Sequence, residues 1–338
     1  MQNNAYLDSK EFTRQLAGDI IRNNKISRDT YDKYDVKRGL RNKDGTGVIA
    51  GITHIGNVIG YEKKDGKKVP AEGRLVYRGY EINDLVNGFL SDGRFGFEET
   101  AYLLIFGNLP DSHTLANFKK IIAECRYLPK SFTEDMILAA PSMDIMNKLA
   151  RSTLALYSYD DSPDPEPGNV AKELDQALHI IARFPVIVAN AMAAKRHYYD
   201  HESLYIHIPN PELSTAENFL YSVRSDNSFT KEEAQLLDLC LVLHAEHGGG
   251  NNSAFSCRVL SSSGTDIYSA IAAAVGSLKG PRHGGANKKV IEMFSYIKKD
   301  VSNWEDDAEL SSYLKKILRK ETADRSGLIY GMGHAIYT

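Results

Sequence analysis

The chain has 338 residues and a formal net charge of −3, and 42% of its residues are hydrophobic and 25% charged. These fractions are typical of globular proteins, and the length allows one large or two ordinary domains with a sizeable core. A charge this small provides no basic field that would attract nucleic acid or an anionic membrane. No segment approaches the roughly 18 uninterrupted apolar residues of a membrane span. We therefore expect small-molecule substrates, and neither nucleic acid nor a membrane as a partner.

The cysteines and the first residues bear on the cellular compartment. Cys125, Cys240 and Cys257 cannot all pair with one another, and they form no CxxC motif. Cys240 lies in an apolar helical run, where we expect it to be buried and inert. The N-terminal residues include acids and lack the apolar stretch of a signal peptide. These features predict a cytoplasmic protein.

The N-terminal part of the chain predicts an arm followed by a hairpin. Residues 1 to about 38 are polar with a weak helical pattern, which we interpret as a surface helix or arm. Two apolar runs, Val58-Ile59 and Leu75 to Tyr77, flank a lysine-rich segment that contains Asp65-Gly66. This arrangement predicts one or two short β-hairpins near residues 55–80.

From Ile82 onward nearly every segment carries apolar residues at helical intervals, so we expect a mostly α fold. The expected helices in the first half of this region are Glu98 to Phe106, Thr114 to Cys125, Thr133 to Ala139 and Met143 to Tyr157. The proline-rich and acidic stretch Asp160 to Gly168 predicts an exposed loop.

The second half of the helical region contains two informative segments. Val170 to Lys195 predicts a long helix kinked at Pro185, followed by a loop that begins at His197. Thr230, with a glutamate three residues later, has the pattern of a capping box. The helix that it starts is apolar nearly all round from Ala234 to Leu243, so we expect it to be buried on most sides.

Two histidines lie among glycines on either side of a helix rich in small residues. His247 follows an apolar run and precedes Gly248 to Gly250, which predicts a helix end that opens into a polar loop. His283 follows Gly280-Pro281 and precedes Gly284-Gly285, where helical periodicity resumes. At a helix start, unpaired N–H groups and the helix dipole favour a neutral imidazole that can donate one hydrogen bond. The glycines allow a substrate to approach the backbone closely.

A third histidine, His334, lies in the glycine-rich segment GMGHAIYT. In order and spacing, the segments HAEHGGGNNSAF, GPRHGGAN and GMGHAIYT resemble the three histidine motifs of the citrate synthase family. The upstream segments RLVYRGYEI, EETAYLLIFGNLP and NFLYSVRS are also similar to that family, so the resemblance covers the chain from about Gly39 to its end. Each motif alone is weak, whereas three in the correct order are specific.

The resemblance implies an acyltransferase that catalyses the entry of acetyl-CoA into the tricarboxylic acid cycle. Acetyl-CoA and oxaloacetate would undergo a Claisen-type condensation to citrate and CoA, with acetyl-CoA as a substrate and no permanently bound cofactor. The resemblance implies that His283 donates to the enolate oxygen of acetyl-CoA. It implies that His334 polarises the ketone of oxaloacetate, and that His247 binds a substrate carboxylate or carbonyl.

Smaller roles follow for the residues around these histidines. Asn251 and Ser253 have two equally good interpretations: they shape the substrate-binding loop and orient His283, or they only cap a helix end. The residues that we assign to coenzyme A binding are Gly280, Arg282 and Gly284. His244 and His247 could face one side of a helix beside Glu246, but no third ligand is placed near them, so we expect no metal.

The resemblance also implies a citrate-synthase-like two-domain helical fold and a homodimer. Residues 1–280 would form the N-terminal part of a large helical domain, and residues 281–338 the beginning of a small one. The active site would lie in the cleft between the domains, which closes on the substrate and excludes water.

Two departures from the family pattern matter. Many members have an acid directly after the first motif's histidine, where this chain has Gly248. The family's aspartate base and its carboxylate-binding arginines lie beyond the third motif, and this sequence ends at Thr338. We therefore expect the C-terminal part of the fold to be absent. Because a general base contributes about 10²- to 10⁴-fold, we also expect little or no condensing activity from the 338-residue chain alone.

Other functions stay open. A 2-methylcitrate synthase, which uses propionyl-CoA, shares these motifs. A non-catalytic fragment would bind a partner or ligand without turnover. A histidine-metal hydrolase is the least favoured, because the sequence places no complete ligand set.

Overall fold

The computed structural model describes residues 27–34, 48, 53–64, 67–164, 166, 168–281 and 283–332. The chain divides into two compact units, Met1–Ile49 and Ala50–Thr338. In the first unit, helix α2 spans Arg28–Lys33. The rest of the arm expected for residues 1 to about 38 lies outside the described residues. The second unit contains all the other elements.

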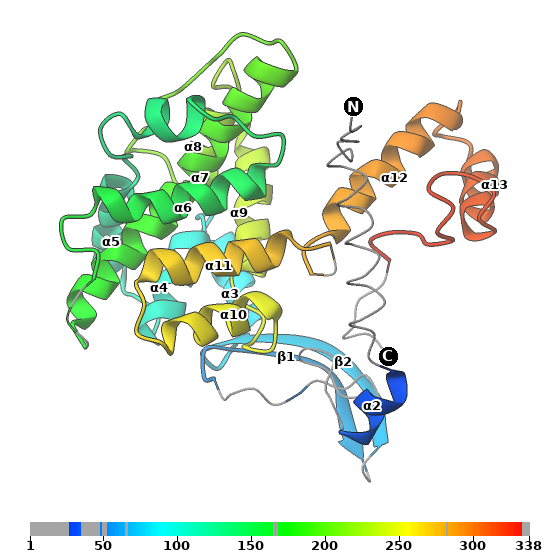
Figure 1. The fold of residues 1–338 in the computed structure, drawn as a ribbon, viewed down its shortest axis with the longest axis horizontal. Helices are drawn as coiled ribbons and strands as arrows, with labels where there is room; N and C mark the ends of the chain where they lie inside the picture. Colours follow the sequence, from blue (N-terminus) through cyan, green and yellow to red (C-terminus); the bar gives the residue numbers. More distant parts are fainter. Residues whose placement is uncertain are drawn as a thin grey trace, which may run out of the picture. The chain divides into compact units, whose positions relative to one another are not determined.

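The hairpin expected near residues 55–80 is confirmed. Strands β1 (Gly56–Lys64) and β2 (Lys67–Tyr77) are antiparallel, and the short β3 (Tyr80–Glu81) pairs with β2 to complete a three-stranded sheet in the order β1-β2-β3. The two long strands extend away from the helices of this unit (Figure 1). The Asp65-Gly66 turn lies outside the described residues.

Helices make up most of the second unit, which confirms the mostly α prediction. The first are α3 (Ile82–Ser91), α4 (Phe97–Phe106), α5 (Ser112–Cys125), the π-helix η1 (Thr133–Leu138), α6 (Ile145–Leu156) and the 3₁₀ turn η2 (Tyr157–Tyr159). They are followed by α7 (Val170–Tyr199), α8 (Thr215–Val223), α9 (Lys231–His244), α10 (Asn252–Ser261), α11 (Ile267–Lys279), α12 (Ala286–Asp300) and α13 (Asp307–Leu318).

Local sequence accounts for where several helices begin. The capping box predicted at Thr230 is present. The Thr230 side chain accepts from the backbone N–H of Glu233, and the Glu233 carboxylate accepts from the Thr230 N–H. Ser214 and Glu217 form a second capping box at the start of α8. Such caps satisfy N–H groups that have no partner inside the helix.

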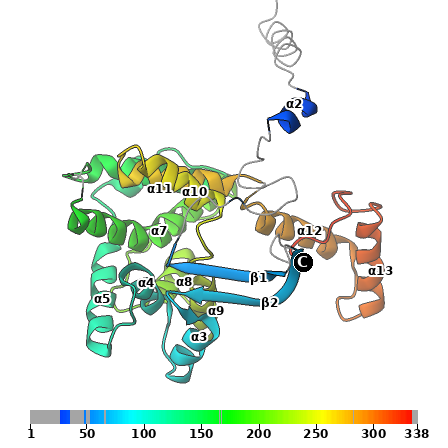
Figure 2. The ribbon, with the colours of Figure 1, turned by 90° about the horizontal axis from the view of Figure 1, so that it is seen from below.

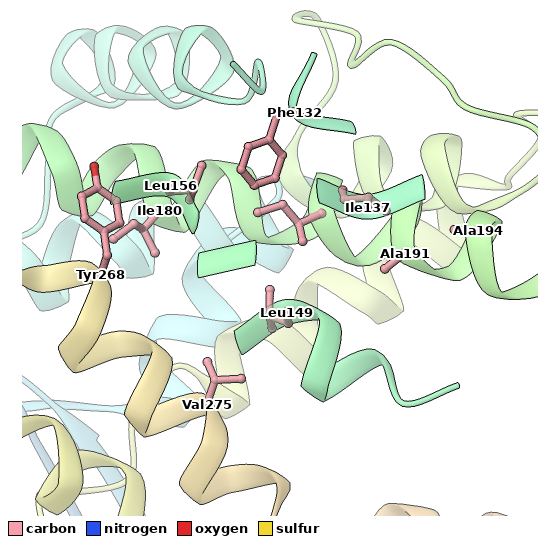
Figure 3. Close-up of a cluster of buried hydrophobic side chains, with 10 residues drawn as sticks. Phe132, Ile137, Leu149, Leu156, Ile180, Ala191, Ala194, Tyr268 and Val275 are labelled. Carbon is pink, nitrogen blue, oxygen red and sulfur yellow. The ribbon is translucent and has the colours of Figure 1, made fainter. Parts of the chain in front are cut away.

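Helix α7 is the centre of the main core. Ile180, Ile187 and Ala191 of α7 pack in one buried cluster with residues of η1, α6 and α11 (Figure 3). By length and composition α7 could cross a membrane, but half of its most apolar window is buried inside this unit, as expected of a core helix. The helix contains Pro185 and continues to Tyr199, so the prediction of a loop from His197 is wrong by three residues.

The buried side chains gather in separate clusters. Phe132 and Leu149 approach α7 from η1 and α6, and Tyr268 and Val275 approach it from α11 (Figure 3). Another buried cluster contains only residues of α12, α13 and their connection, namely Met293, Ile297, Val301, Tyr313 and Ile317. The domain boundary that we expect near residue 280 stays a prediction.

Helix α9 contradicts two expectations. Its buried residues, Ala234, Asp238 and Val242, lie on one face, whereas Leu236 is 64% exposed. Cys240 is exposed as well, so the predictions of a helix buried on most sides and of a buried cysteine are wrong. Helix α9 packs mainly against α8 and α4, and one contact face buries only one stripe of an apolar helix.

The buried face of α9 carries an acid that caps another helix. Asp238, 1% exposed, accepts hydrogen bonds from the backbone N–H groups of Gly96 (2.6 Å) and Phe97 (3.1 Å) at the start of α4. Burial nevertheless raises the pKa of Asp238 from its ordinary value of 3.8 to about 6, because these two bonds offset only part of the desolvation of the carboxylate. Asp238 thus joins α9 to α4 and remains costly to ionise.

Asp238 should make the protein less stable as the pH rises from about 4 to about 6. In this window the carboxyl is ionised in the unfolded chain and protonated in the folded one, so its contribution to stability is full below pH 4 and lost above pH 6. The shift of about two pKa units corresponds to about 3 kcal/mol. We expect Asp238→Asn to remove this dependence from urea-unfolding free energies measured between pH 4 and 7.

A suitable control is Asp111→Asn. Asp111 is an exposed cap of α5, and its hydrogen bond from the Thr114 N–H lowers its pKa, so its contribution has the opposite sign. Equal pH slopes in the wild-type protein and Asp238→Asn would contradict the account of Asp238.

Candidate active site

His283 lies in a tight turn between α11 and α12. Gly280 leaves α11 in an extended conformation, and its carbonyl oxygen accepts from the N–H groups of His283 (2.9 Å) and Gly284 (3.1 Å). Helix α12 begins at Ala286, so His283 precedes the first helical residue by three positions. The turn holds the half-buried imidazole just outside the helix N-terminus that the sequence predicts.

Two glycines of this turn, Gly284 and Gly285, lie so close to other backbone atoms that a side chain would not fit. A Cβ atom at Gly284 would collide with the carbonyl oxygen of Leu278, and one at Gly285 would lie 2.6 Å from the carbonyl oxygen of Pro281. Backbone atoms cannot move aside as the end of a flexible side chain can. Gly284 and Gly285 therefore serve the shape of the turn in this structure, and the contact of Gly280 and Gly284 with coenzyme A stays a prediction.

Substituting alanine at Gly284 and at Gly276 should change the stability of the protein in opposite directions. Gly284→Ala is expected to destabilise the protein by about 1–3 kcal/mol, because the turn must shift to relieve the collision with Leu278. Gly276→Ala in α11 is expected to stabilise it by about 0.5–1 kcal/mol, since no atom lies within 4 Å of the new methyl group and alanine favours a helix. Urea unfolding measures the free energy of unfolding of both variants. A Gly284→Ala protein as stable as the wild type would show that the turn can shift without cost.

The loop that contains His247 is fixed by its own backbone and by Asn251. Helix α9 ends at His244, and the exposed His247 is followed by Gly248, whose φ of +93° favours glycine. The side chain of Asn251 accepts from the Ala254 N–H (2.9 Å) and donates to the Gly248 carbonyl (3.2 Å). Asn251 therefore caps α10 and also fixes the Gly248 carbonyl of the loop, and its part in substrate binding stays a prediction.

Ser253 connects the first histidine motif to the second. Its Oγ lies 2.9 Å from Nε2 of His283, between the first turn of α10 and the turn before α12. With the serine hydroxyl as donor, the ring proton is on Nδ1, which has no hydrogen-bond partner among the described residues. This geometry leaves one ring N–H available to donate to a ligand oxygen.

The structure describes only some of the predicted site residues. His334 and Arg282 lie outside the described residues, so their positions are not part of this geometry. Hydrogen bonds connect Ser253 to His283 and Asn251 to the loop of His247. Within the described ranges, no group of three or more His, Cys, Asp or Glu side chains is placed to hold a metal ion.

Sequence reasoning named Tyr77 and Glu246 but missed that both support the His247 loop. The hydroxyl of Tyr77 contacts the end of α9, and the carboxylate of Glu246 accepts from the Gly248 N–H. No spacing rule connects a tyrosine in a hairpin to a loop 169 residues later. The buried side chain of Tyr77, which reaches from the end of β2 to the end of α9, is what brings them together.

Comparison with known proteins decides the family. The family model described as "Citrate synthase, C-terminal domain" matches residues 44–338. The chain belongs to the citrate synthase family. It is 35% identical over 295 residues to citrate synthase from Acidithiobacillus ferridurans, which covers 86% of this chain and 67% of that protein. It is 32% identical over 307 residues to 2-methylcitrate synthase from Mycobacterium tuberculosis, covering 90% and 66%.

Solved citrate synthases have the same fold. The enzyme from Pyrobaculum aerophilum superposes with a TM-score of 0.67 at 26% identity, covering 86% of this chain and 65% of that one. Citrate synthase from Thermoplasma acidophilum, solved as a ternary complex with carboxymethyl coenzyme A and oxaloacetate, gives 0.65 at 25% identity, covering 85% and 66%. The chain thus spans about two thirds of the length of the relatives that it matches.

Proposed function

We propose that this citrate synthase family protein condenses acetyl-CoA with oxaloacetate to give citrate and CoA. A proton leaves the acetyl methyl group, the resulting enolate carbon bonds to the ketone carbon of oxaloacetate, and the ketone oxygen takes up a proton. Water then cleaves the thioester and releases CoA. The observation that supports this most is the hydrogen bond between Ser253 and His283, which aligns a ring donor between two glycine-rich motifs.

His283 is the proposed donor to the enolate oxygen. Its free Nδ1 can hydrogen-bond the thioester carbonyl as negative charge develops there, a contribution of about 2.7–4 kcal/mol to the barrier in comparable sites. His247 is proposed to bind a carboxylate or carbonyl of oxaloacetate, and His334 to polarise its ketone. We assign no residue as the base that removes the methyl proton.

The proposed substrates are two small molecules, and no permanently bound cofactor or metal is required. Oxaloacetate appears with a coenzyme A analogue in the Thermoplasma acidophilum relative, which supports this substrate class. A cytoplasmic location completes the proposal.

A homodimer is also proposed. Helix α11 packs against both α6 and α10, and each of the three exposes a large apolar side chain: Leu154 is 52% exposed, Val259 51% and Leu278 41%. A second subunit that covers these side chains would remove their apolar area from water, as contiguous apolar patches at interfaces do. Sedimentation velocity at micromolar concentration tests this, and a monomer would contradict it.

Two acyl donors and one binding titration test the reaction. Where turnover is measured, we expect CoA release with oxaloacetate to be faster from acetyl-CoA than from propionyl-CoA, compared as kcat/KM. The reverse preference would favour 2-methylcitrate synthase, which the similarity to the Mycobacterium tuberculosis enzyme keeps as the second candidate. Absence of both turnover and heat in calorimetry with oxaloacetate would favour a non-catalytic fragment.

A further inference from the structure

The hydroxyl of Tyr77 lies at the base of the candidate site. The side chain, at the end of β2, is 0% exposed, and its Oη donates to the carbonyl oxygens of Val242 (2.9 Å) and Leu243 (3.3 Å). The same oxygen accepts from the N–H of Glu246 (3.2 Å). One buried hydroxyl therefore contacts both the last turn of α9 and the N–H of Glu246, two residues beyond the helix.

From Glu246 a chain of hydrogen bonds continues to the catalytic imidazole. The Glu246 carboxylate accepts from the Gly248 N–H, the Gly248 carbonyl accepts from Asn251 (3.2 Å), and Asn251 caps α10. Ser253, in the first turn of α10, then contacts Nε2 of His283 at 2.9 Å. Each bond fixes the position of the next group along the chain.

The place of Glu246 over β1 depends on a glycine. A Cβ atom at Gly56, which pairs with Tyr77 in the hairpin register, would collide with Cγ of Glu246. The hairpin thus supplies both a hydroxyl for the end of α9 and the space for the Glu246 side chain. Figure 2 shows the same two strands leaving the layer of helices that contains α9.

We propose that Tyr77 is a positioning residue, whose hydroxyl sets the loop of His247 and, through Glu246, Asn251 and Ser253, the ring of His283. This role rests on the function proposed above. Burial raises the pKa of Tyr77, so its hydroxyl remains a donor at neutral pH. Phenylalanine would keep the ring in place and remove only the three hydrogen bonds.

The neighbouring residue offers a matched control. Arg78 donates from Nε (3.0 Å) and from a terminal guanidinium nitrogen (2.7 Å) to the carbonyl oxygen of Leu104, near the end of α4. It caps a different helix from the same strand end, and none of its hydrogen bonds reaches the histidine loop. Arg78→Met therefore removes a comparable cap without affecting the chain of hydrogen bonds to His283.

The test combines histidine-ring NMR with amide hydrogen exchange on the 338-residue chain. We expect Tyr77→Phe to shift the ring-nitrogen resonances of His247 and His283 and to speed exchange at Gly248 and Ala254 by about tenfold, the effect of losing one hydrogen bond. Arg78→Met should leave both rings unchanged and speed exchange at Gly107, which caps α4. Unchanged rings in Tyr77→Phe, or equal shifts in both variants, would overturn the positioning role.

A second variant and a ligand separate this inference from the function. If Tyr77→Phe does not fold, Glu246→Ala tests the positioning role instead. It removes the hydrogen bond between the Glu246 carboxylate and the Gly248 N–H without touching the buried Tyr77 ring, and should also shift the His283 resonance. Oxaloacetate is then titrated into the wild-type chain and Tyr77→Phe, where we expect about tenfold weaker binding in the variant. Shifted rings without any oxaloacetate binding by the wild type would support positioning and contradict the proposed function. Equal affinities in the two proteins would overturn the role of Tyr77.

Discussion

Replacing His283 with alanine is expected to weaken carboxymethyl-CoA binding in saturating oxaloacetate by about 10²- to 10³-fold, the effect of removing one donor from an oxyanion site. Where turnover is measured, kcat should fall by a similar factor. The reason is Nδ1 of His283, which carries the ring proton when the Ser253 hydroxyl donates to Nε2, and which has no hydrogen-bond partner among the described residues. Calorimetry and a thiol assay for CoA release make the two measurements.

Two further variants show whether the loss of affinity and rate in His283→Ala comes from the imidazole itself. Ser253→Ala should weaken carboxymethyl-CoA binding, and lower kcat, by only about tenfold, because it releases the His283 ring without removing the donor. His113→Ala, at an exposed position of α5, should change neither affinity nor rate. A His283→Ala protein that behaves like His113→Ala would remove His283 from the proposed mechanism.

The largest expected loss of stability comes from Glu98. Its side chain is 2% exposed, and Oε1 accepts from the Thr215 N–H (2.7 Å) and lies 3.9 Å from the guanidinium of Arg126, itself only 4% exposed. Glu98→Ala leaves a buried cation without its partner, which typically costs 3–5 kcal/mol. We expect about 3 kcal/mol in urea unfolding, since the carbonyl oxygens of Leu213 and Asn210 still accept from Arg126.

An exposed ion pair provides the comparison. Arg74 pairs with Glu81 at the surface, where the two side chains are 55% and 35% exposed. Arg74→Ala should change the free energy of unfolding by no more than about 1 kcal/mol, because water screens the pair. Equal effects of Arg74→Ala and Glu98→Ala would show that burial of the Glu98 carboxylate does not decide its contribution.

Much of the fold follows from local patterns. The hairpin, the helices from α4 to α7 and the capping box at Thr230 were predicted from periodicity and cap residues, because such features involve near neighbours in the chain. The burial of α9 was not predictable in this way. Its apolar run carries no information on how many helices surround it, so Leu236 and Cys240 are exposed against expectation.

The site shows the same limit. Glycines around His247 and His283 identify both loops from the sequence, since a positive φ at Gly248 and the crowded turn at Gly284 need residues without a side chain. The sequence left the role of Ser253 open, because capping and orienting use the same hydroxyl. Tyr77 was predicted to lie in the hairpin, but its contact with the end of α9 forms only in the folded chain and has no local sequence signal.

A crystal structure of the protein with oxaloacetate and carboxymethyl-CoA tests the central claim most directly, that His247, His283 and His334 converge on one pair of substrates. We expect Nδ1 of His283 within hydrogen-bond distance of the coenzyme A analogue's carboxylate, and His247 and His334 in contact with oxaloacetate oxygens. Ligands bound elsewhere, or these three rings in separate environments, would contradict the account.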